Sequence, residues 1–314
     1  MKKISIVTPC YNEEQNVETL YQQVKDVFYL LPQYNYEHIF IDNSSTDKTV
    51  NILKKIAVTD KNIKIIVNIR NFGHIRSPYY GILQAKGDAV VLVVADLQDP
   101  PDMITRFLEK WEEGYKIVIG TKYKSKENKL LFFIRKIFYT IISRISETEQ
   151  VKNFTGFGLY DKSFVAILRT IDEPYPYFRG LITELGFNRI EIPYIQPKRI
   201  KGKTNNNFYT LYDAAMLSFT SYTKIGLRLA TFIGAIFAGL SIIVGIIYLV
   251  LKIIYWDRFM AGMAPLILIV SFMSSLQIFF IGLMGEYILS MNKRLMNRPL
   301  VIEEERLNFS TKEQ

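Results

Sequence analysis

The chain has 314 residues, of which 49% are hydrophobic and 14% aromatic, and a formal net charge of +9. This composition supports a packed core and argues against an intrinsically disordered protein. The single cysteine, Cys10, excludes an intrachain disulfide and a cysteine-cluster zinc site. The positive charge favours an anionic partner, for which nucleic acid, a phosphorylated substrate and an anionic bilayer are the candidates.

Alternating strands and helices are predicted along residues 1–120. Short apolar runs indicate the strands, and apolar residues at helical spacing indicate the helices between them. Each strand runs directly into polar residues at its carboxyl end. This alternation predicts an α/β fold with a parallel, doubly wound sheet, which binds ligands beyond the carboxyl ends of its strands. The expected strands are residues 4–7, 38–41, 63–67, 90–94 and 116–120, followed by strand-like runs at 153–162 and 190–195.

The longest of these apolar runs, at residues 90–95, is rich in valine and has no polar break. Such a run is typical of a central strand that is covered on both faces. It leads into Asp96, Gln98 and Asp99, so this cluster is expected where an α/β sheet places its ligand site. The sequence has no GxGxxG after the first strand and no Walker glycine loop, which disfavours an oxidoreductase and an ATPase.

Two long stretches, residues 229–251 and 259–285, contain no charged residue. As a helix the first is about 35 Å long, which exceeds the ~30 Å hydrocarbon core of a bilayer. The stretches predict a transmembrane hairpin with spans at 229–251 and 262–285, and they favour a membrane over nucleic acid as the partner. Basic residues are more numerous outside the two spans than in their connection, so the positive-inside rule places both termini in the cytoplasm.

The patterns divide the chain into parts with different surroundings. A basic, aromatic segment at residues 128–146 either lies in the membrane interface or packs on the sheet as an ordinary amphipathic helix. The apolar run at residues 4–7 is too short for a signal peptide, which predicts a cytoplasmic N-terminal domain. From residue 301 the tail is acidic and is expected to be loosely ordered. We therefore expect a catalytic domain at residues 1–207, a juxtamembrane amphipathic helix at 208–228, two spans within 229–290, and a cytoplasmic tail at 291–314.

Three stretches resemble the nucleotide-sugar motifs of family 2 glycosyltransferases, which have the GT-A fold. They are Pro9-Cys10-Tyr11-Asn12-Glu13, residues 42–49, and Ala95-Asp96-Leu97-Gln98-Asp99-Pro100-Pro101. The later pattern Arg199-x-x-Gly202-x-Thr204 and the two apolar stretches make the chain similar to the polyprenyl-phosphate glycosyltransferases, relatives of dolichol-phosphate-mannose synthase and bactoprenol glucosyltransferase. The resemblance covers nearly the whole chain. It implies a GT-A domain with a mostly parallel sheet, amphipathic interface helices and a C-terminal transmembrane hairpin.

The resemblance implies a hexosyltransferase of the plasma membrane. Such an enzyme moves one sugar from a nucleotide-sugar, with UDP-glucose favoured, to a polyprenyl phosphate such as undecaprenyl phosphate on the cytoplasmic leaflet. It inverts the anomeric carbon, uses Mg²⁺ or Mn²⁺, and is expected to form a homo-oligomer. Two other functions stay open: a processive polysaccharide synthase, which Gln196-x-x-Arg199 faintly resembles, and a non-catalytic nucleotide-sugar-binding membrane protein.

The resemblance also implies roles for individual residues. Asp96 is expected to bind the metal, because a hard cation held by a carboxylate neutralises a diphosphate leaving group. Asp96 and Arg199 are the expected catalytic residues, and the acceptor phosphate is expected to meet Arg199, Lys201, Lys203 and Thr204. The nucleotide-sugar is expected to contact Pro9, Tyr11, Asn12, Glu13, Asp42, Asn43, Arg70, His74, Asp96 and Gln98.

Each assignment has a structural alternative. Asn12 and Glu13 can instead cap the first helix, and Asp96 can be a helix-capping or loop carboxylate. Arg70 can be an ordinary surface cation. The basic run at residues 199–203 can be a juxtamembrane patch on anionic lipid.

The chain departs from the family pattern at three places. The family has an aspartate where this chain has Val94, and commonly another where it has Asn43. A carboxylate proposed as the base in relatives should fall within residues 153–158, where none is present, and Asp161 further along is expected to be structural. The second pKa of a phosphate monoester is about 6, so such an acceptor is already ionised at neutral pH and needs no base.

Overall fold

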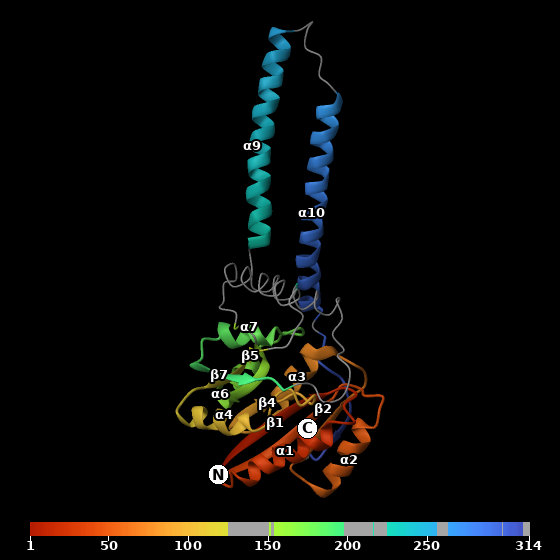
Figure 1. Ribbon diagram of the computed structural model, residues 1–314. Coiled ribbons are helices and arrows are strands. Elements are labelled where there is room, and N and C mark those ends of the chain that lie inside the picture. The colour runs from red at the N-terminus through yellow and green to blue at the C-terminus, as the bar shows by residue number, and fades with distance from the viewer. Residues whose placement is uncertain are drawn as a thin grey trace.

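The structure, a computed structural model of the 314-residue chain, describes residues 1–124, 151, 154–197, 216, 225–255, 263–296 and 298–309. These residues form an α/β domain from which two long helices project (Figure 1). The segment at 128–146, most of the expected helix at 208–228, and the predicted acceptor residues lie outside the described residues. Those acceptor residues are Arg199, Lys201, Lys203 and Thr204.

The strands and helices expected in the N-terminal half all form, with boundaries that shift by a few residues. In chain order the domain contains β1 (Lys2–Cys10), α1 (Val17–Tyr29), β2 (Tyr34–Asp42), α2 (Thr49–Thr59), β3 (Ile63–Asn68), α3 (Gly73–Gln84), β4 (Ala89–Leu92), α4 (Met103–Glu112), β5 (Ile117–Lys124), β6 (Phe154–Asp161), α6 (Lys162–Thr170), α7 (Phe178–Glu184), β7 (Arg189–Ile195) and β8 (Glu303–Leu307). The strands form one eight-stranded sheet in the order β7-β5-β6-β4-β1-β2-β3-β8.

The sheet is mostly parallel, as the resemblance implies, and strands β1 to β5 of the predicted alternation all run in the same direction. Two later strands run the other way. β6 lies between β4 and β5 and is antiparallel to both, and β8 is antiparallel to β3. A glycine allows β6 to take this place. A Cβ atom at Gly158 would lie 2.5 Å from the carbonyl oxygen of Val118, so a larger residue would push β6 away from β5.

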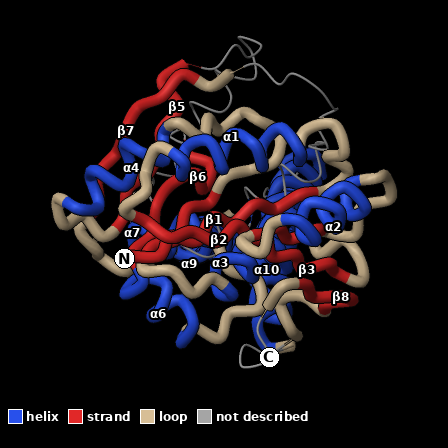
Figure 2. Tube along the Cα trace, turned by 90° about the horizontal axis from the view of Figure 1, so that it is seen from below, coloured by secondary structure: helices blue, strands red, loops and turns tan. Residues whose placement is uncertain are grey.

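Helices cover both faces of the sheet and enclose two apolar cores (Figure 2). α1, α2 and α4 pack on one face, where Leu20, Leu53 and Phe107 are buried. α3, α6 and α7 pack on the other face around Tyr79 and Phe164. The loops that follow β1, β2, β3 and β4 therefore meet at the carboxyl edge of the sheet, between the two helical layers.

Beyond the domain, α9 (Ile225–Ile254) and α10 (Met263–Leu295) run side by side away from the sheet (Figure 1). Their aromatic side chains meet: the ring centroids of Phe237 and Phe272 are 5.9 Å apart. The stretches Thr231–Ile254 and Phe272–Asn292 are long and apolar enough to cross a membrane, with mean hydropathies of 2.6 and 1.5. Neither stretch is buried against the rest of the protein, unlike the core helix of a soluble domain.

The chain after α10 is not the loosely ordered tail that its acidic composition predicts. It returns to the domain, where β8 pairs with β3 as the edge strand of the sheet. Asn308 donates from Nδ2 to the carbonyl oxygens of Ala57 and Ile63, at 2.8 Å each. Two of its acidic side chains have basic partners: Glu303 pairs with Arg306, and Glu305 pairs with Lys54. This segment covers the free edge of β3 and ties the end of α10 to the domain.

Candidate active site

Three loops at the carboxyl edge each hold a residue in the left-handed region of the backbone. Asn12 follows β1 with a φ of 55°, Ser44 follows β2 with a φ of 65°, and Leu97 follows β4 with a φ of 59°. This conformation strains a leucine in particular, and it persists only where surrounding contacts hold the loop in one shape. Held loops of this kind are typical of binding sites.

The loops after β1 and β2 are joined by hydrogen bonds. The backbone N–H of Asn12 donates to Ser45 Oγ at 2.8 Å, and Asn12 Oδ1 accepts from the backbone N–H of Thr46 at 2.8 Å. The backbone N–H of Glu13 donates to Thr49 Oγ1 at 2.9 Å. α1 has no side-chain cap hydrogen bond. Asn12 and Glu13 therefore connect two loops of the edge. The Glu13 carbonyl oxygen also accepts from the backbone N–H groups of Asn16 and Val17, so Glu13 meets the start of α1 through its backbone and not through a side-chain cap.

Asp42 is buried at the end of β2, where the following loop wraps around its carboxylate. Its Oδ2 accepts from the Ser45 backbone N–H at 2.8 Å, and its Oδ1 accepts from Ser45 Oγ at 2.5 Å. Burial raises the pKa of Asp42 above its usual value, while the hydrogen bonds from Ser45 oppose that rise. Burial and the charge of Asp42 also raise the pKa of the neighbouring Cys10 thiol, so the cysteine serves packing and not nucleophilic chemistry.

Asn43 holds the loop that follows β3. Its Oδ1 accepts from the backbone N–H of Phe72 at 2.8 Å and from Asn68 Nδ2 at 3.2 Å. Its Nδ2 donates to Asn71 Oδ1 at 2.9 Å and to the carbonyl oxygen of Gly73 at 3.3 Å. The side-chain amide of Asn43 thus acts both as a hydrogen-bond acceptor and as a donor. A carboxylate at this position could accept the first two bonds but could not donate the last two.

The loop after β4 carries two carboxylates in different surroundings. Asp96 is half-buried, and its Oδ1 accepts from the backbone N–H of Gln98 at 3.1 Å. Asp99 is buried and accepts from the hydroxyl of Tyr194 in β7 at 2.8 Å. Burial raises the pKa of Asp99 to about 6, although Tyr194 and the charge of Lys122 act to lower it. Asp99 therefore holds the loop against β7, and Asp96 is the carboxylate left accessible at the edge.

Asp96 has the surroundings of a minimal divalent-cation site. Among the residues that the structure describes, no three His, Cys, Asp or Glu side chains converge as metal ligands. Mg²⁺ is nevertheless commonly bound through one or two carboxylates, with substrate phosphates and waters as the other ligands. α4 begins only at Met103, so Asp96 does not cap it. A single accessible carboxylate at this edge fits a metal that is shared with a diphosphate.

The loop after β3 brings two further candidates to the edge. Arg70 is exposed, and its guanidinium carbon lies 4.2 Å from the centre of the Phe72 ring. His74 is the second residue of α3. Partial desolvation of its ring and the charge of Arg179 lower its pKa. A lowered pKa favours the neutral imidazole, which can donate or accept a hydrogen bond.

β6 begins at the same edge, because it runs antiparallel to β4. Phe154 to Gly158 at its start carry no carboxylate. Asp161 lies at the far end of the strand, where it accepts from the Ser163 backbone N–H at 2.9 Å and caps α6, and also accepts from Trp111 Nε1 at 2.7 Å. The prediction that Asp161 is structural is confirmed.

A hollow of about 590 Å³ borders the Asp96 loop at the carboxyl edge. Its walls come from α4, β5 and β7, and they include Pro100, Tyr123, Tyr194 and Ile195. Tyr123 and Ile195 are apolar but remain 71% and 75% exposed. The hollow therefore offers a mostly apolar surface beside the polar loops, although Asp102 and Arg106 also line it.

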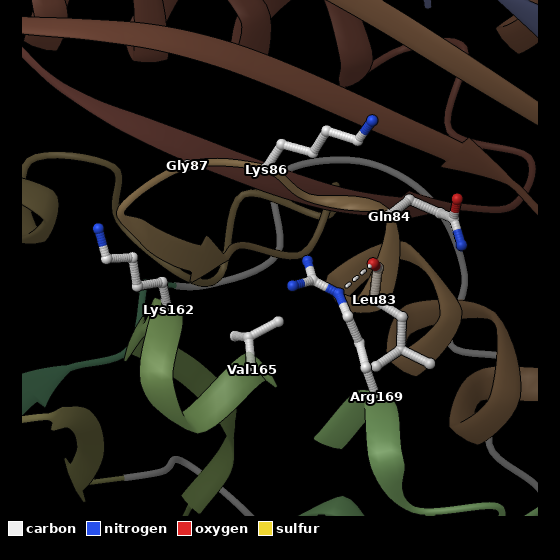
Figure 3. A pocket seen from close by; sticks show the side chains of 7 residues that line it. All are labelled: Leu83, Gln84, Lys86, Gly87, Lys162, Val165 and Arg169. Atoms are coloured by element: carbon white, nitrogen blue, oxygen red, sulfur yellow. Dashed lines mark hydrogen bonds between the residues drawn. The ribbon is translucent and has the colours of Figure 1, made fainter. Parts of the chain in front are cut away.

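A second hollow, of about 410 Å³, lies between α3 and α6 at the opposite edge of the sheet (Figure 3). Lys86, Lys162 and Arg169 project around it. Arg169 Nε donates to the carbonyl oxygen of Leu83 at 3.0 Å, and Lys162 pairs with Asp88 at 2.7 Å. Arg169 thus joins α6 to α3, and Lys162 joins α6 to the turn before β4. The hollow is remote from the predicted site residues.

The structure brings the predicted donor residues together from four loops, whereas the predicted acceptor residues lie outside its described part. Pro9 and Tyr11 are half-buried beside Asn12 and Glu13. Of the other donor residues, Asp42 ends β2 and His74 lies in the first turn of α3, and the rest lie on the loops after β2, β3 and β4. Sequence reasoning missed the residues that hold these loops. Most of them are polar residues just after a strand, which was a usable signal, but Tyr194 is 95 positions from Asp99 and had none. The missed residues are Ser45, Thr49, Asn68, Asn71 and Tyr194.

The mostly parallel sheet, its two helical layers and the polar loops at its carboxyl edge define an α/β transferase domain of the GT-A type. The chain belongs to glycosyl transferase family 2, whose model matches residues 5–175. The family predicted from the sequence is thereby confirmed, and the protein is a glycosyltransferase.

Individual relatives extend this similarity beyond the domain. The chain is 31% identical to an uncharacterized glycosyltransferase, YkcC, of Bacillus subtilis (strain 168), over 98% of this chain and 95% of the relative. It is 30% identical to the prophage bactoprenol glucosyl transferase homolog of Escherichia coli (strain K12), over 91% of this chain and 93% of the relative. The solved mannosyltransferase PcManGT from Pyrobaculum calidifontis, in complex with GDP-Man and Mn²⁺, is 15% identical with a TM-score of 0.48, over 70% of this chain and 62% of that one.

Proposed function

We propose that the protein transfers a single sugar from a nucleotide-sugar, with UDP-glucose the first choice, to a polyprenyl phosphate such as undecaprenyl phosphate. One observation carries this proposal. The carboxyl edge, with the loops that hold Asp42 and Asp96, belongs to the same domain that β8 connects to a pair of apolar helices. The names of relatives that match nearly end to end support the choice of substrates, since several are bactoprenol glucosyl transferases.

In this proposal the carboxyl edge receives the nucleotide-sugar. The loop at residues 9–13, with Asp42, would meet the nucleoside, and Arg70 and Gln98 would approach the phosphates. Asp96 would hold a Mg²⁺ or Mn²⁺ ion, which when bound neutralises charge on the diphosphate leaving group. Asn43 would act by holding the Phe72–Gly73 backbone in place.

The acceptor supplies its own nucleophile. A phosphate monoester oxygen, already ionised at neutral pH, attacks the anomeric carbon as the bond to the donor diphosphate breaks, which inverts that carbon. The absence of a carboxylate at the start of β6 therefore does not prevent the reaction. Arg199, Lys201, Lys203 and Thr204 are proposed to hold the acceptor phosphate by charge and hydrogen bonds. The hollow beside Tyr123 and Ile195 suits the apolar chain of the lipid.

The proposed setting is the plasma membrane. α9 and α10 would cross it as a hairpin, with the domain at residues 1–207 and both termini in the cytoplasm. A homo-oligomer formed through these helices is part of the proposal.

Transfer of radiolabelled glucose from UDP-glucose to undecaprenyl phosphate in membranes tests the proposal. We expect lipid-linked product, and a loss of roughly 100-fold for Asp96→Asn with an unchanged thermal midpoint, because the site then lacks its accessible carboxylate. Glu109→Gln is the matched control, since Glu109 is an exposed carboxylate on α4 that does not line the hollow. Arg199→Ala should weaken use of the lipid more than binding of UDP.

Each rival has a distinct outcome in this assay. Products longer than one sugar would identify a processive synthase. Binding of nucleotide-sugars without turnover across a panel of UDP- and GDP-sugars would identify a non-catalytic binding protein. Full activity of Asp96→Asn would reject the role assigned to that carboxylate.

A further inference from the structure

Three arginines gather where the domain meets the end of α10. The guanidinium carbon of Arg70 lies 4.2 Å from the centre of the Phe72 ring, and that of Arg76 lies 5.2 Å from it. Phe72 is buried, so its ring is a fixed support for both side chains. Two guanidinium groups are thereby held near one another at the start of α3.

Arg298 joins them from the segment that follows α10. Arg76 donates from Nη2 to the backbone carbonyl oxygen of Pro299, the residue next to Arg298. Burial lowers the pKa of the Arg76 guanidinium, and the charges of Arg70 and Arg298 lower it further. We call Arg70, Arg76 and Arg298 the arginine cluster.

The arginine cluster has no acidic counterpart in the described part of the chain. No described carboxylate forms an ion pair with any of its three members. In addition, the Nε–H of Arg76 is buried and has no hydrogen-bond partner. Adjacent like charges and a buried donor without an acceptor both destabilise the folded chain. An anion with several acceptor oxygens relieves both, and a phosphate group presents oxygens that guanidinium forks bind in a bidentate manner.

The arginine cluster also lies at the level where a membrane surface would be. The apolar stretch of α10 ends at Asn292, six residues before Arg298. α3, which carries Arg76, lies close below that end of α10 (Figure 1). Lipid phosphates occur just outside the hydrocarbon core, and basic residues beside a span commonly bind them.

We propose that the arginine cluster is a binding site for the phosphate group of a membrane lipid. The group is the phosphodiester of an anionic phospholipid or the phosphomonoester of a polyprenyl phosphate, which present the same kind of oxygen to the arginines. The inference rests on the proposed function only for the placement of α9 and α10 in a membrane. A phosphate bound between α3 and the segment before β8 holds the domain at a fixed height below the bilayer.

Binding of short-chain lipids to the full-length protein in non-ionic detergent tests the site. The probes are dioctanoyl phosphatidylglycerol, which carries an anionic phosphodiester, and farnesyl phosphate, which carries a phosphomonoester. Zwitterionic dioctanoyl phosphatidylcholine and UDP complete the set. The test variant is Arg76→Gln with Arg298→Gln; Arg70 is left intact because it is also a proposed donor contact. Removing two cations that each contribute about 1 kcal/mol should weaken binding roughly 30-fold.

Two further variants separate charge from folding. Arg76→Lys with Arg298→Lys keeps the charge and should keep most of the binding. Lys55→Gln with Lys61→Gln removes the same charge from exposed positions on α2 and the turn after it, and should leave binding unchanged. The lipid whose binding falls identifies the source of the phosphate.

The inference is overturned if Arg76→Gln with Arg298→Gln binds both anionic lipids as well as the parent does. It is also overturned if Lys55→Gln with Lys61→Gln weakens lipid binding as much, or if only UDP binding falls. Since none of these measurements requires sugar transfer, an inactive transferase and an absent lipid site give different results.

Discussion

Hydrogen-bond direction explains, at the scale of single residues, why this chain departs from the family pattern after β2. Asn43 accepts on one side of its amide and donates on the other, to Asn71 Oδ1 and to the Gly73 carbonyl. An aspartate can only accept when ionised, so the loop after β3 in this protein requires the amide. The departure is therefore compatible with an intact site.

Asn43→Asp should accordingly be harmful although it restores the family residue. A carboxylate there would face two oxygens at 2.9 and 3.3 Å, and we expect a loss of about 1–3 kcal/mol of folding free energy with weaker UDP binding. Thermal unfolding and UDP titration of the full-length protein measure both. The control is Asn51→Asp, at an exposed position of α2. Equal stability of Asn43→Asp and the parent would show that the amide donors are not needed.

Glu37 is a second residue whose surroundings make a measurable prediction. It is buried in β2 and pairs with Lys3 at 2.6 Å and Lys64 at 3.0 Å. Burial alone would raise its pKa, but hydrogen bonds from Lys3, Ser5, the Lys86 backbone N–H and Lys64 outweigh it and lower the pKa from 4.5 to about 2. The unfolded chain therefore takes up the proton first as the pH falls. The stabilisation, about 3 kcal/mol, is complete above pH 4.5 and is lost toward pH 2.

Glu37→Gln tests this pH dependence. We expect the variant to melt well below the parent at pH 7 and the difference to shrink at pH 3, because the parent has by then lost most of its advantage. Glu304→Gln, at an exposed position of β8, should leave the thermal midpoint unchanged. A difference that stays constant from pH 7 to pH 3 would contradict the lowered pKa.

At the scale of elements, β8 shows that the C-terminal segment is an ordered strand of the sheet and not a loose tail. Short, acidic and far from the domain in sequence, it nevertheless completes the sheet, because β3 otherwise presents an unpaired edge. Ile302 accepts at its carbonyl from the backbone N–H of Ile69 at 3.1 Å, so the pairing reaches the loop that leads to Arg70. The end of α10 is thus connected to the donor edge.

Asn308→Gly isolates part of this attachment. Asn308 has a φ of 59°, which glycine adopts without strain, so the substitution removes the two hydrogen bonds to Ala57 and Ile63 and spares the backbone. We expect the variant to lose about 1–3 kcal/mol of folding free energy relative to the parent. Hydrogen exchange of the β3 amides should accelerate more than that of the β1 amides. Truncation after residue 309 is the matched control. Unchanged exchange in Asn308→Gly would show that β8 is held by the ladder alone.

At the scale of the whole molecule, the domain is joined to its helices at two points, before α9 and after α10. A hairpin with both ends on one side satisfies this arrangement, since β8 must return to the same domain that precedes α9. Cys10 makes the topology testable: it is 4% exposed, and burial raises the pKa of its thiol, so it does not react in the folded protein.

Single cysteines should therefore report the sides of the membrane without removal of Cys10. In intact cells an impermeant maleimide should label Asp257→Cys, between the two helices, and should label Gln314→Cys only after permeabilisation. The parent protein is the control for Cys10. Labelling of both variants from outside, or of neither, would exclude the proposed orientation.

The sequence alone determined the element types, the family and the polar loops at the carboxyl edge, because these follow from local apolar periodicity and from motifs that are short and ordered. Val90–Pro101 predicted a central strand and a carboxylate at its carboxyl end, and both are present as β4 and Asp96. Tertiary structure decided which strands pair and which polar groups form hydrogen bonds within the protein. The insertion of β6, the return of β8 and the Asp99–Tyr194 bond join residues far apart in the chain, and no local pattern encodes a partner that folding alone brings near.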